Sequence, residues 1–178
     1  LKPVEHVLET SFENVGAILH PASVLFKAVA IDGGECPYLY QGNTEKFSKF
    51  LEELDNERTK MARAYGVEAR SLKSWIKASY PSSSGENLIG LMNTNPAYNS
   101  IRSPSSLNSR LLNEDIPTGL IPFIGFGEIA GLERNMMRAS TTILGSLLSE
   151  DFFKKGRTLD KLGLKSNSPR DIINEVMK

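Results

Sequence analysis

The sequence contains a single cysteine, Cys36, and only two histidines, His6 and His20. One cysteine cannot form an internal disulfide, so we expect a reducing, cytoplasmic setting. These three residues also provide no recognisable zinc-binding spacing, and we expect no metal site. No partner for a reactive thiolate is evident near Cys36, which we expect to be a packing residue, and His6 is expected to be solvated.

The chain has no excess of charge of either sign, because 21 Lys and Arg residues balance 21 Asp and Glu residues. Without a basic cluster there is no electrostatic reason to expect nucleic acid or an anionic membrane as a partner. No apolar stretch reaches the length of about 18 residues that is typical of a membrane span. The first residues do not resemble a signal peptide, and they include no initiator Met. We therefore expect no membrane partner, and we expect the chain to be a piece of a longer protein.

Apolar residues recur at helical spacing, which predicts one all-α domain over residues 1–178. One expected helix, 44–65, has a charged face that includes Asp55 and Arg58. In the helix expected at 15–31, we expect a bend or interruption at Pro21. The expected helices cover roughly 15–31, 44–65, 72–80, 136–148 and 168–176.

No segment is convincing as a strand, and the best candidate, 119–124, contains Pro122, which disfavours a central strand. The segment 93–108 is rich in Asn, Pro and Ser and is long for a loop without structure, so we expect it to line a site. Residues 125–130 match the dinucleotide-binding pattern G-x-G-x-x-A, which binds a pyrophosphate where a strand meets a helix. Because no strand is expected before it, we expect no dinucleotide-binding fold here and assign no cofactor-binding residues.

Four residues allow both a structural and a chemical interpretation. His20 is either a core histidine bonded to a backbone carbonyl or a proton-transfer group, since an unperturbed imidazole has a pKa of about 6.5. Asp115, which precedes Ile-Pro, is either a simple cap or a carboxylate that orients a histidine and fixes its tautomer. Arg110 is either a surface residue or a bidentate partner for a substrate carboxylate. Trp75 is either core or a cover for a substrate side chain at the edge of a cleft.

Four segments, taken in order along the chain, resemble the C-terminal domain of the octopine/nopaline-type opine dehydrogenases. The most specific is RLLNEDIPTGLIP at 110–122. The others are ENVGAILHPA at 13–22, LDNER at 54–58 and GRTLDKLGL at 156–164. Together they extend from Asn14 to Leu164, which is most of the chain.

The resemblance implies a family that joins an α-amino acid to an α-keto acid and reduces the imine with hydride from NAD or NADP. It implies an all-helical domain of the 6-phosphogluconate dehydrogenase C-terminal-domain-like type, and an N-terminal Rossmann domain, absent from this chain, that holds the cofactor. On this basis His20 is the acid/base, Asp115 orients it, and Arg110 binds the keto-acid carboxylate. Asn14 is a supporting residue of the active site, and Trp75 contacts the amino-acid substrate.

Two other functions stay open on the sequence alone. One is a helical interaction or dimerisation domain without chemistry, a role that a homodimer would fit. The other is a relative within the β-hydroxyacid dehydrogenase-like superfamily that acts on another keto or hydroxy acid. In either enzymatic case we expect this chain alone to be inactive and to bind NAD(P)H weakly or not at all.

Overall fold

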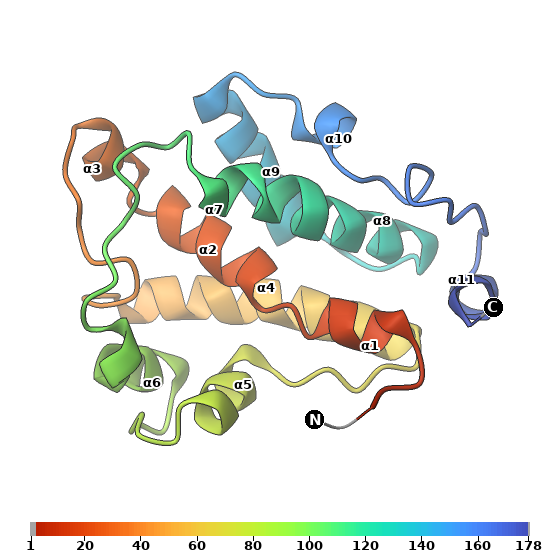
Figure 1. Ribbon diagram of the computed structural model, residues 1–178, viewed down its shortest axis with the longest axis horizontal. Helices are drawn as coiled ribbons and strands as arrows, with labels where there is room; N and C mark the ends of the chain where they lie inside the picture. The colour runs from red at the N-terminus through yellow and green to blue at the C-terminus, as the bar shows by residue number, and fades with distance from the viewer. Residues whose placement is uncertain (1–2, 178) are drawn as a thin grey trace.

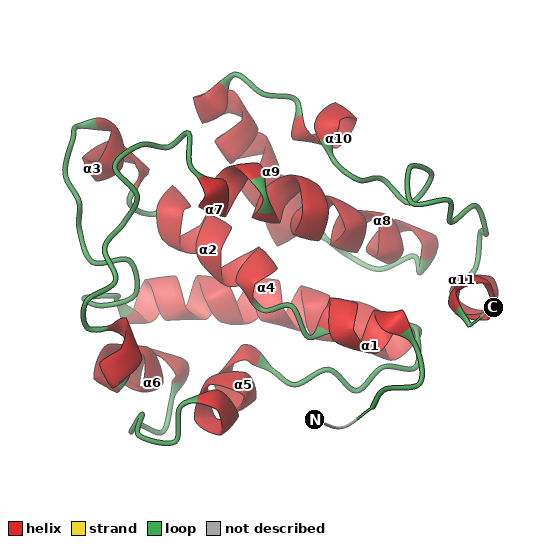
Figure 2. Cartoon of the chain, viewed as in Figure 1, coloured by secondary structure: helices red, strands yellow, loops and turns green. Residues whose placement is uncertain are grey.

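The computed structural model describes residues 3–177, and every regular element in that range is helical (Figure 2). The described residues form no β-strand; one isolated antiparallel bridge joins Tyr38 to Arg102. The all-α prediction is therefore confirmed. The elements are α1 (Val7–Phe12), α2 (Gly16–Leu25), α3 (Ala28–Asp32), α4 (Glu45–Ala64), α5 (Leu72–Ser79), α6 (Leu88–Thr94), η1 (Pro96–Tyr98), α7 (Arg110–Asn113), η2 (Ile116–Leu120), α8 (Ile121–Ile129), α9 (Asn135–Leu148), α10 (Phe152–Lys155) and α11 (Pro169–Val176).

Helix α2 lies in the middle of the molecule and crosses α4 (Figure 1). It also packs against α7, η2 and α9, so Ala17, Ile18 and Ala22 on α2 are fully buried. The continuous run of α7, η2 and α8 lies on one side of α2, and α5 and α6 lie on the other (Figure 1). In the described part of the chain, no helix combines the length and the apolar character needed to cross a membrane.

Helix α4 forms as its sequence predicts. The Thr44 side chain accepts a hydrogen bond from the Phe47 N–H, which caps the first turn. The helix ends before Gly66, whose positive φ of 72° suits glycine at such a stop. The predicted apolar face is buried at Leu51, Leu54 and other positions.

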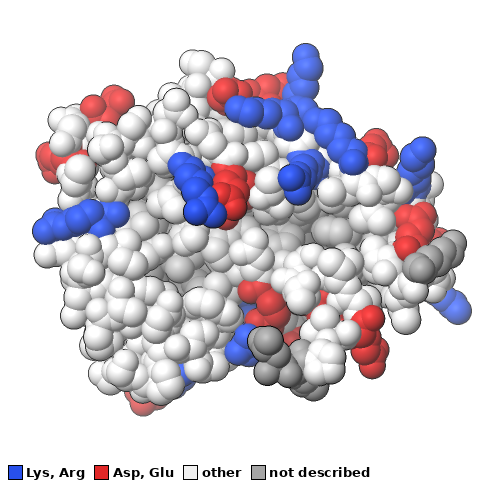
Figure 3. Space-filling model, in the orientation of Figure 1, with Lys and Arg blue, Asp and Glu red and all other residues white. Residues whose placement is uncertain are grey.

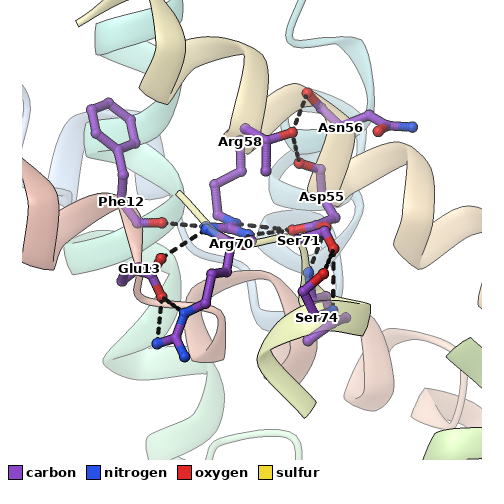
Figure 4. A network of polar contacts seen from close by, with 10 residues as sticks. Phe12, Glu13, Asp55, Asn56, Arg58, Arg70, Ser71 and Ser74 are labelled. Atoms are coloured by element: carbon purple, nitrogen blue, oxygen red, sulfur yellow. Dashed lines mark hydrogen bonds and ion pairs between the residues drawn. The ribbon is translucent and has the colours of Figure 1, made fainter. Parts of the chain in front are cut away.

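The charged face of α4 was expected to be exposed to solvent, and this expectation was wrong for Asp55 and Arg58. Arg58 is fully buried and Asp55 is 6% exposed. The Arg58 guanidinium donates to Asp55 Oδ1 and to the carbonyls of Phe12 and Arg70 (Figure 4). Asp55 Oδ2 in turn accepts from the Leu72 N–H at 2.6 Å. The two charges can be buried because they are paired with each other and hydrogen-bonded to backbone groups. These contacts connect α1 and α5 to α4.

The helices expected at 72–80, 136–148 and 168–176 are present as α5, α9 and α11. The helix expected at 15–31 is present as α2 and α3, but its break is at Phe26 and Lys27 and not at Pro21. Pro21 lies inside α2, where only one backbone hydrogen bond is lost and the surrounding helices hold the segment in place.

Candidate active site

The central feature of the site is a contact between His20 on α2 and Asp115 at the start of η2. These residues are 95 positions apart in the sequence, and His20 Nδ1 lies 2.8 Å from Asp115 Oδ2. The side chain of His20 is 29% exposed and that of Asp115 is 17% exposed, so the histidine is not sealed in the core. A proton on Nδ1 would be donated to the carboxylate, which leaves Nε2 for proton exchange with another molecule.

A close crossing between η2 and α2 brings this pair together. A Cβ atom at Gly119 would lie only 2.5 Å from Cβ of Ala17, so the approach requires glycine at this position. The η2 segment is a π-helical turn that begins directly after Asp115. Such turns are rare and often occur at functional sites. The local geometry of 116–120 therefore sets the distance between the carboxylate and the imidazole.

A cavity of about 310 Å³ opens beside His20. Its walls come from the start of α2, from Trp75 and Tyr80 of the α5 region, and from two loops that carry Tyr40 and Tyr98. The face of the molecule turned toward the viewer in Figure 1 is hollowed near its middle, where the surface is mostly uncharged and charged groups lie at the rim (Figure 3).

Aromatic rings follow one another along the cavity as far as His20. The ring centroids of neighbours are 5.9 Å apart for Trp75 and Tyr80, 5.4 Å for Tyr80 and Tyr98, 4.5 Å for Tyr98 and Tyr40, and 6.2 Å for Tyr40 and His20. Burial raises the pKa of Tyr40 and of Tyr98 well above the ordinary value for tyrosine. These two phenols are therefore neutral across the physiological range and add no charge to the wall of the cavity.

Two backbone hydrogen bonds hold the loops that carry Tyr40 and Tyr98 side by side. The Leu39 N–H donates to the Ile101 carbonyl at 2.9 Å, and the Ser103 N–H donates to the Pro37 carbonyl at 2.8 Å. The segment 93–108 therefore lines the cavity through Tyr98 and Ile101, as we expected for this long loop. It is also less irregular than its composition indicates, because it contains η1.

Asn14 and Gly16 shape the edge of the cavity nearest to His20. A Cβ atom at Gly16 would lie 3.2 Å from Asn14 Oδ1 and 3.2 Å from His20 Cε1, so glycine leaves room for both side chains. Asn14 is exposed and also lines a second cavity of about 630 Å³, which extends toward Phe123 and Arg157. The structure therefore brings Asn14 close to the His20 ring.

Arg110 lies on the short helix α7, just before Asp115, but it does not line the cavity. Its side chain is 85% exposed, and its Nη2 donates to Glu114 Oε1 at 3.2 Å. The hydrogen bond between the two side chains raises the pKa of Arg110 and lowers the pKa of Glu114, and the opposite charge of each partner acts in the same direction. Arg110 is thus a paired cation at the edge of the His20–Asp115 site.

Two expectations about single residues were wrong. Cys36 is exposed and does not pack in the core, because it lies in the loop that follows α3. His6 is half-buried at the start of α1 and not freely solvated. Tyr40 and Tyr98 were not among the residues expected at the site, although aromatic residues in segments without helical periodicity are a signal that could have indicated them.

The dinucleotide-like pattern lies inside α8, and its glycines serve packing: a Cβ atom at Gly125 would lie 2.9 Å from Leu159, and one at Gly127 would lie 2.6 Å from Met61. This segment is therefore helical and does not form a turn between a strand and a helix. Within residues 3–177, no group of three or more His, Cys, Asp or Glu side chains is placed to hold a metal ion.

This fold is that of the helical domain of octopine dehydrogenase. The structure of that enzyme with NADH and L-arginine matches with a TM-score of 0.82 and 20% identity, over 98% of this chain and 50% of that chain. Its complex with NADH and agmatine matches with a TM-score of 0.81 and 21% identity, over 98% of this chain and 50% of that chain. The sequence model described as NAD/NADP octopine/nopaline dehydrogenase, alpha-helical domain, matches residues 3–148. The chain therefore belongs to the octopine/nopaline dehydrogenase family.

Two relatives give the same result at the level of sequence. An opine dehydrogenase of Arthrobacter sp. (strain 1C) is 37% identical over 97% of this chain and 48% of its own length. A vitopine synthase of Allorhizobium ampelinum is 27% identical over 93% of this chain and 46% of its own length. The chain thus spans about half the length of the curated relatives it matches.

Proposed function

We propose that this chain is the catalytic and substrate-binding half of an NAD(P)-dependent opine dehydrogenase, which joins an α-amino acid reductively to an α-keto acid. The observation that supports this most strongly is the 2.8 Å contact between His20 and Asp115 beside a cavity, in a chain of this family. The relatives are about twice as long, which supports a second domain. Because the dinucleotide-like pattern is part of α8, the proposed NADH or NADPH is held mainly by that second domain, a Rossmann domain N-terminal to this one.

In this proposal His20 moves a proton twice. Neutral Nε2 takes a proton from the α-ammonium group of the amino acid, and the free amine then attacks the keto carbonyl. The imidazolium returns the proton to the hydroxyl group of the resulting carbinolamine, which leaves as water when the C=N bond forms. Asp115 keeps the ring in the required tautomer and stabilises its charged form. Hydride for the imine carbon comes from the nicotinamide.

Three further residues receive proposed roles. Arg110 binds the keto-acid carboxylate bidentately, which requires its guanidinium to exchange Glu114 for the substrate. Its large exposure is compatible with such a movement. Asn14 supports the reacting groups next to His20, and Trp75 contacts the amino-acid substrate from the far end of the aromatic wall.

The test uses the longer enzyme that contains this domain together with its nucleotide-binding domain. His20→Ala should lower kcat by about 10²–10⁴-fold with the melting temperature nearly unchanged, since this is the usual size of general acid–base catalysis. Asp115→Asn should also lower kcat, and Arg110→Ala should mainly raise KM for the keto acid. His6→Gln is the matched histidine control and should retain activity.

A His20→Ala variant within a few-fold of the wild-type kcat would show that this residue is not the acid/base. If the wild-type enzyme fails to oxidise NAD(P)H with every pair of amino and keto acids, the result would favour a non-catalytic interaction domain.

A further inference from the structure

We propose that the cavity beside His20 binds the side chain of the amino-acid substrate, and that it selects an uncharged apolar or aromatic side chain over arginine or glutamate. The inference rests on the proposed function and adds the substrate class. It concerns the walls of the cavity and does not depend on which α-keto acid reacts.

The first argument is the chemistry of the walls. The cavity next to the proton-transfer group is lined by Trp75, Tyr80 and Tyr98, and by the aliphatic side chains of Leu19 and Ile101. Aromatic faces and edges bind apolar and aromatic groups favourably, and the rings here lie 4.5–5.9 Å from their neighbours. A cavity of about 310 Å³ is at the lower end of the usual size of small-molecule sites.

The second argument is charge. Among the described residues that line the cavity, Glu13 is the only carboxylate, and Arg70 already neutralises it. Glu13 Oε1 accepts from the Arg70 N–H at 2.7 Å, and Oε2 accepts from Arg70 Nε at 3.1 Å. A substrate guanidinium would therefore find no unpaired carboxylate here. A substrate carboxylate would likewise find Arg70 already paired.

The third argument is the rigidity of that pair. The Arg70 carbonyl accepts from Arg58 Nη2 at 2.6 Å (Figure 4), and the Leu72 N–H donates to Asp55 at 2.6 Å. Arg58 also binds the carbonyl of Phe12, the residue before Glu13. The buried network thus holds the backbone on both sides of the Glu13–Arg70 pair. The backbone that carries Glu13 and Arg70 is therefore held in place, and a charged substrate would have to break the ion pair between their side chains to bind either of them.

The experiment compares amino acids in the longer enzyme, with pyruvate as the keto acid and oxidation of NADH or NADPH as the readout. L-phenylalanine and L-leucine should give kcat/KM values about 10- to 200-fold above those of L-arginine and L-glutamate, the range that pocket complementarity can supply. A preference for arginine or glutamate would overturn the inference and leave the proposed function intact. No turnover with any pair of amino acid and α-keto acid would refute the proposed function itself.

Two pairs of variants test the walls and the charge separately. Trp75→Ala should lower kcat/KM for phenylalanine about tenfold more than kcat/KM for alanine, a substrate without a large side chain. Trp75→Phe should leave the ratio of these two kcat/KM values unchanged. Arg70→Ala leaves the charge of Glu13 without its partner and should raise the ratio of kcat/KM for arginine to kcat/KM for phenylalanine about tenfold. Arg70→Lys keeps a positive charge there and should leave this ratio unchanged. Equal losses for phenylalanine and alanine in Trp75→Ala, or an unchanged ratio in Arg70→Ala with the fold retained, would contradict the proposed subsite.

Discussion

Replacing Gly119 with alanine would place a methyl group where η2 crosses α2. The new Cβ atom would lie 2.5 Å from Cβ and 3.3 Å from Cα of Ala17, whereas carbon atoms in contact prefer about 3.5–4.0 Å. Both opposing atoms belong to a short, rigid residue of a buried helix, so the strain cannot be relieved by a side-chain rotation. Overpacking of this kind costs about 1–3 kcal/mol. We expect η2 to move away from α2 and to carry Asp115 away from His20.

A double-mutant cycle isolates this contact. Ala17→Gly alone should cost about 1 kcal/mol, because glycine is unfavourable inside a helix. It removes the opposing methyl group, so the double variant should be less destabilised than the sum of the single variants, by about 0.5–3 kcal/mol.

Urea denaturation of all four proteins at one pH measures the free energies of unfolding. Turnover of the longer enzyme should follow the same order, with Gly119→Ala the least active. A cost for Gly119→Ala below about 0.5 kcal/mol, or strict additivity with Ala17→Gly, would refute the argument that this crossing sets the distance between Asp115 and His20.

Three further predictions follow from the packing. Arg58→Met should lower the free energy of unfolding by about 3–5 kcal/mol, because it leaves Asp55 and two backbone carbonyls without their buried partner. The control Lys60→Met changes an exposed residue of the same helix and should alter the free energy of unfolding by less than about 0.5 kcal/mol. Urea denaturation measures both variants. Glu57→Ala should cost about 0.5–2 kcal/mol, since Glu57 accepts from the N–H groups of Met136 and Met137 at the start of α9, and a smaller loss in Glu57→Gln would separate its charge from its hydrogen bonds. The 178-residue chain alone should show no submicromolar binding of NADH in calorimetry, because Gly125 and Gly127 lie inside α8; tight binding would contradict the packing role assigned to these glycines.

Helices with local signals could be predicted from the sequence. Thr44 marks the start of α4, and the Ser168-Pro169 pair marks the start of α11. The hydroxyl groups of Thr44 and Ser168 each accept a hydrogen bond from a backbone N–H in the first turn of the helix that follows. The break after α2 could not be predicted in the same way. Pro21 is the strongest local helix breaker in that segment, but the helix continues through it because neighbouring elements hold both sides. Tertiary packing there outweighs local preference.

Asp55 and Arg58 show a different limit of periodicity. Both fall on the side of α4 that is rich in charge, and a charged residue is usually exposed. They are buried because Arg58 also binds the carbonyls of Phe12 and Arg70, which lie outside α4, before and after it in the sequence. No pattern within 44–65 contains that information. The resemblance of 54–58 to the family marked these residues as notable, but only the structure gives their contacts.

Some residues of the site could be selected from the sequence, whereas others became apparent only from contacts between distant segments. His20 and Asp115 were selected because their segments resemble the family, and the structure places them in contact across 95 positions. Trp75 was also selected, but Tyr40 and Tyr98 were missed because the rings of the cavity come from three separate segments that are joined only by loop hydrogen bonds and packing.

The glycines show why a motif requires its structural context. Gly125 and Gly127 match a dinucleotide pattern, yet they admit Leu159 and Met61 to the core. Gly119 matches no such pattern, yet it allows the crossing that positions Asp115 beside His20. The functional meaning of each glycine is therefore set by which atoms approach its missing Cβ. By that criterion, a role in positioning a site is better supported for Gly119 than for 125–130, because the crossing at Gly119 brings Asp115 to His20.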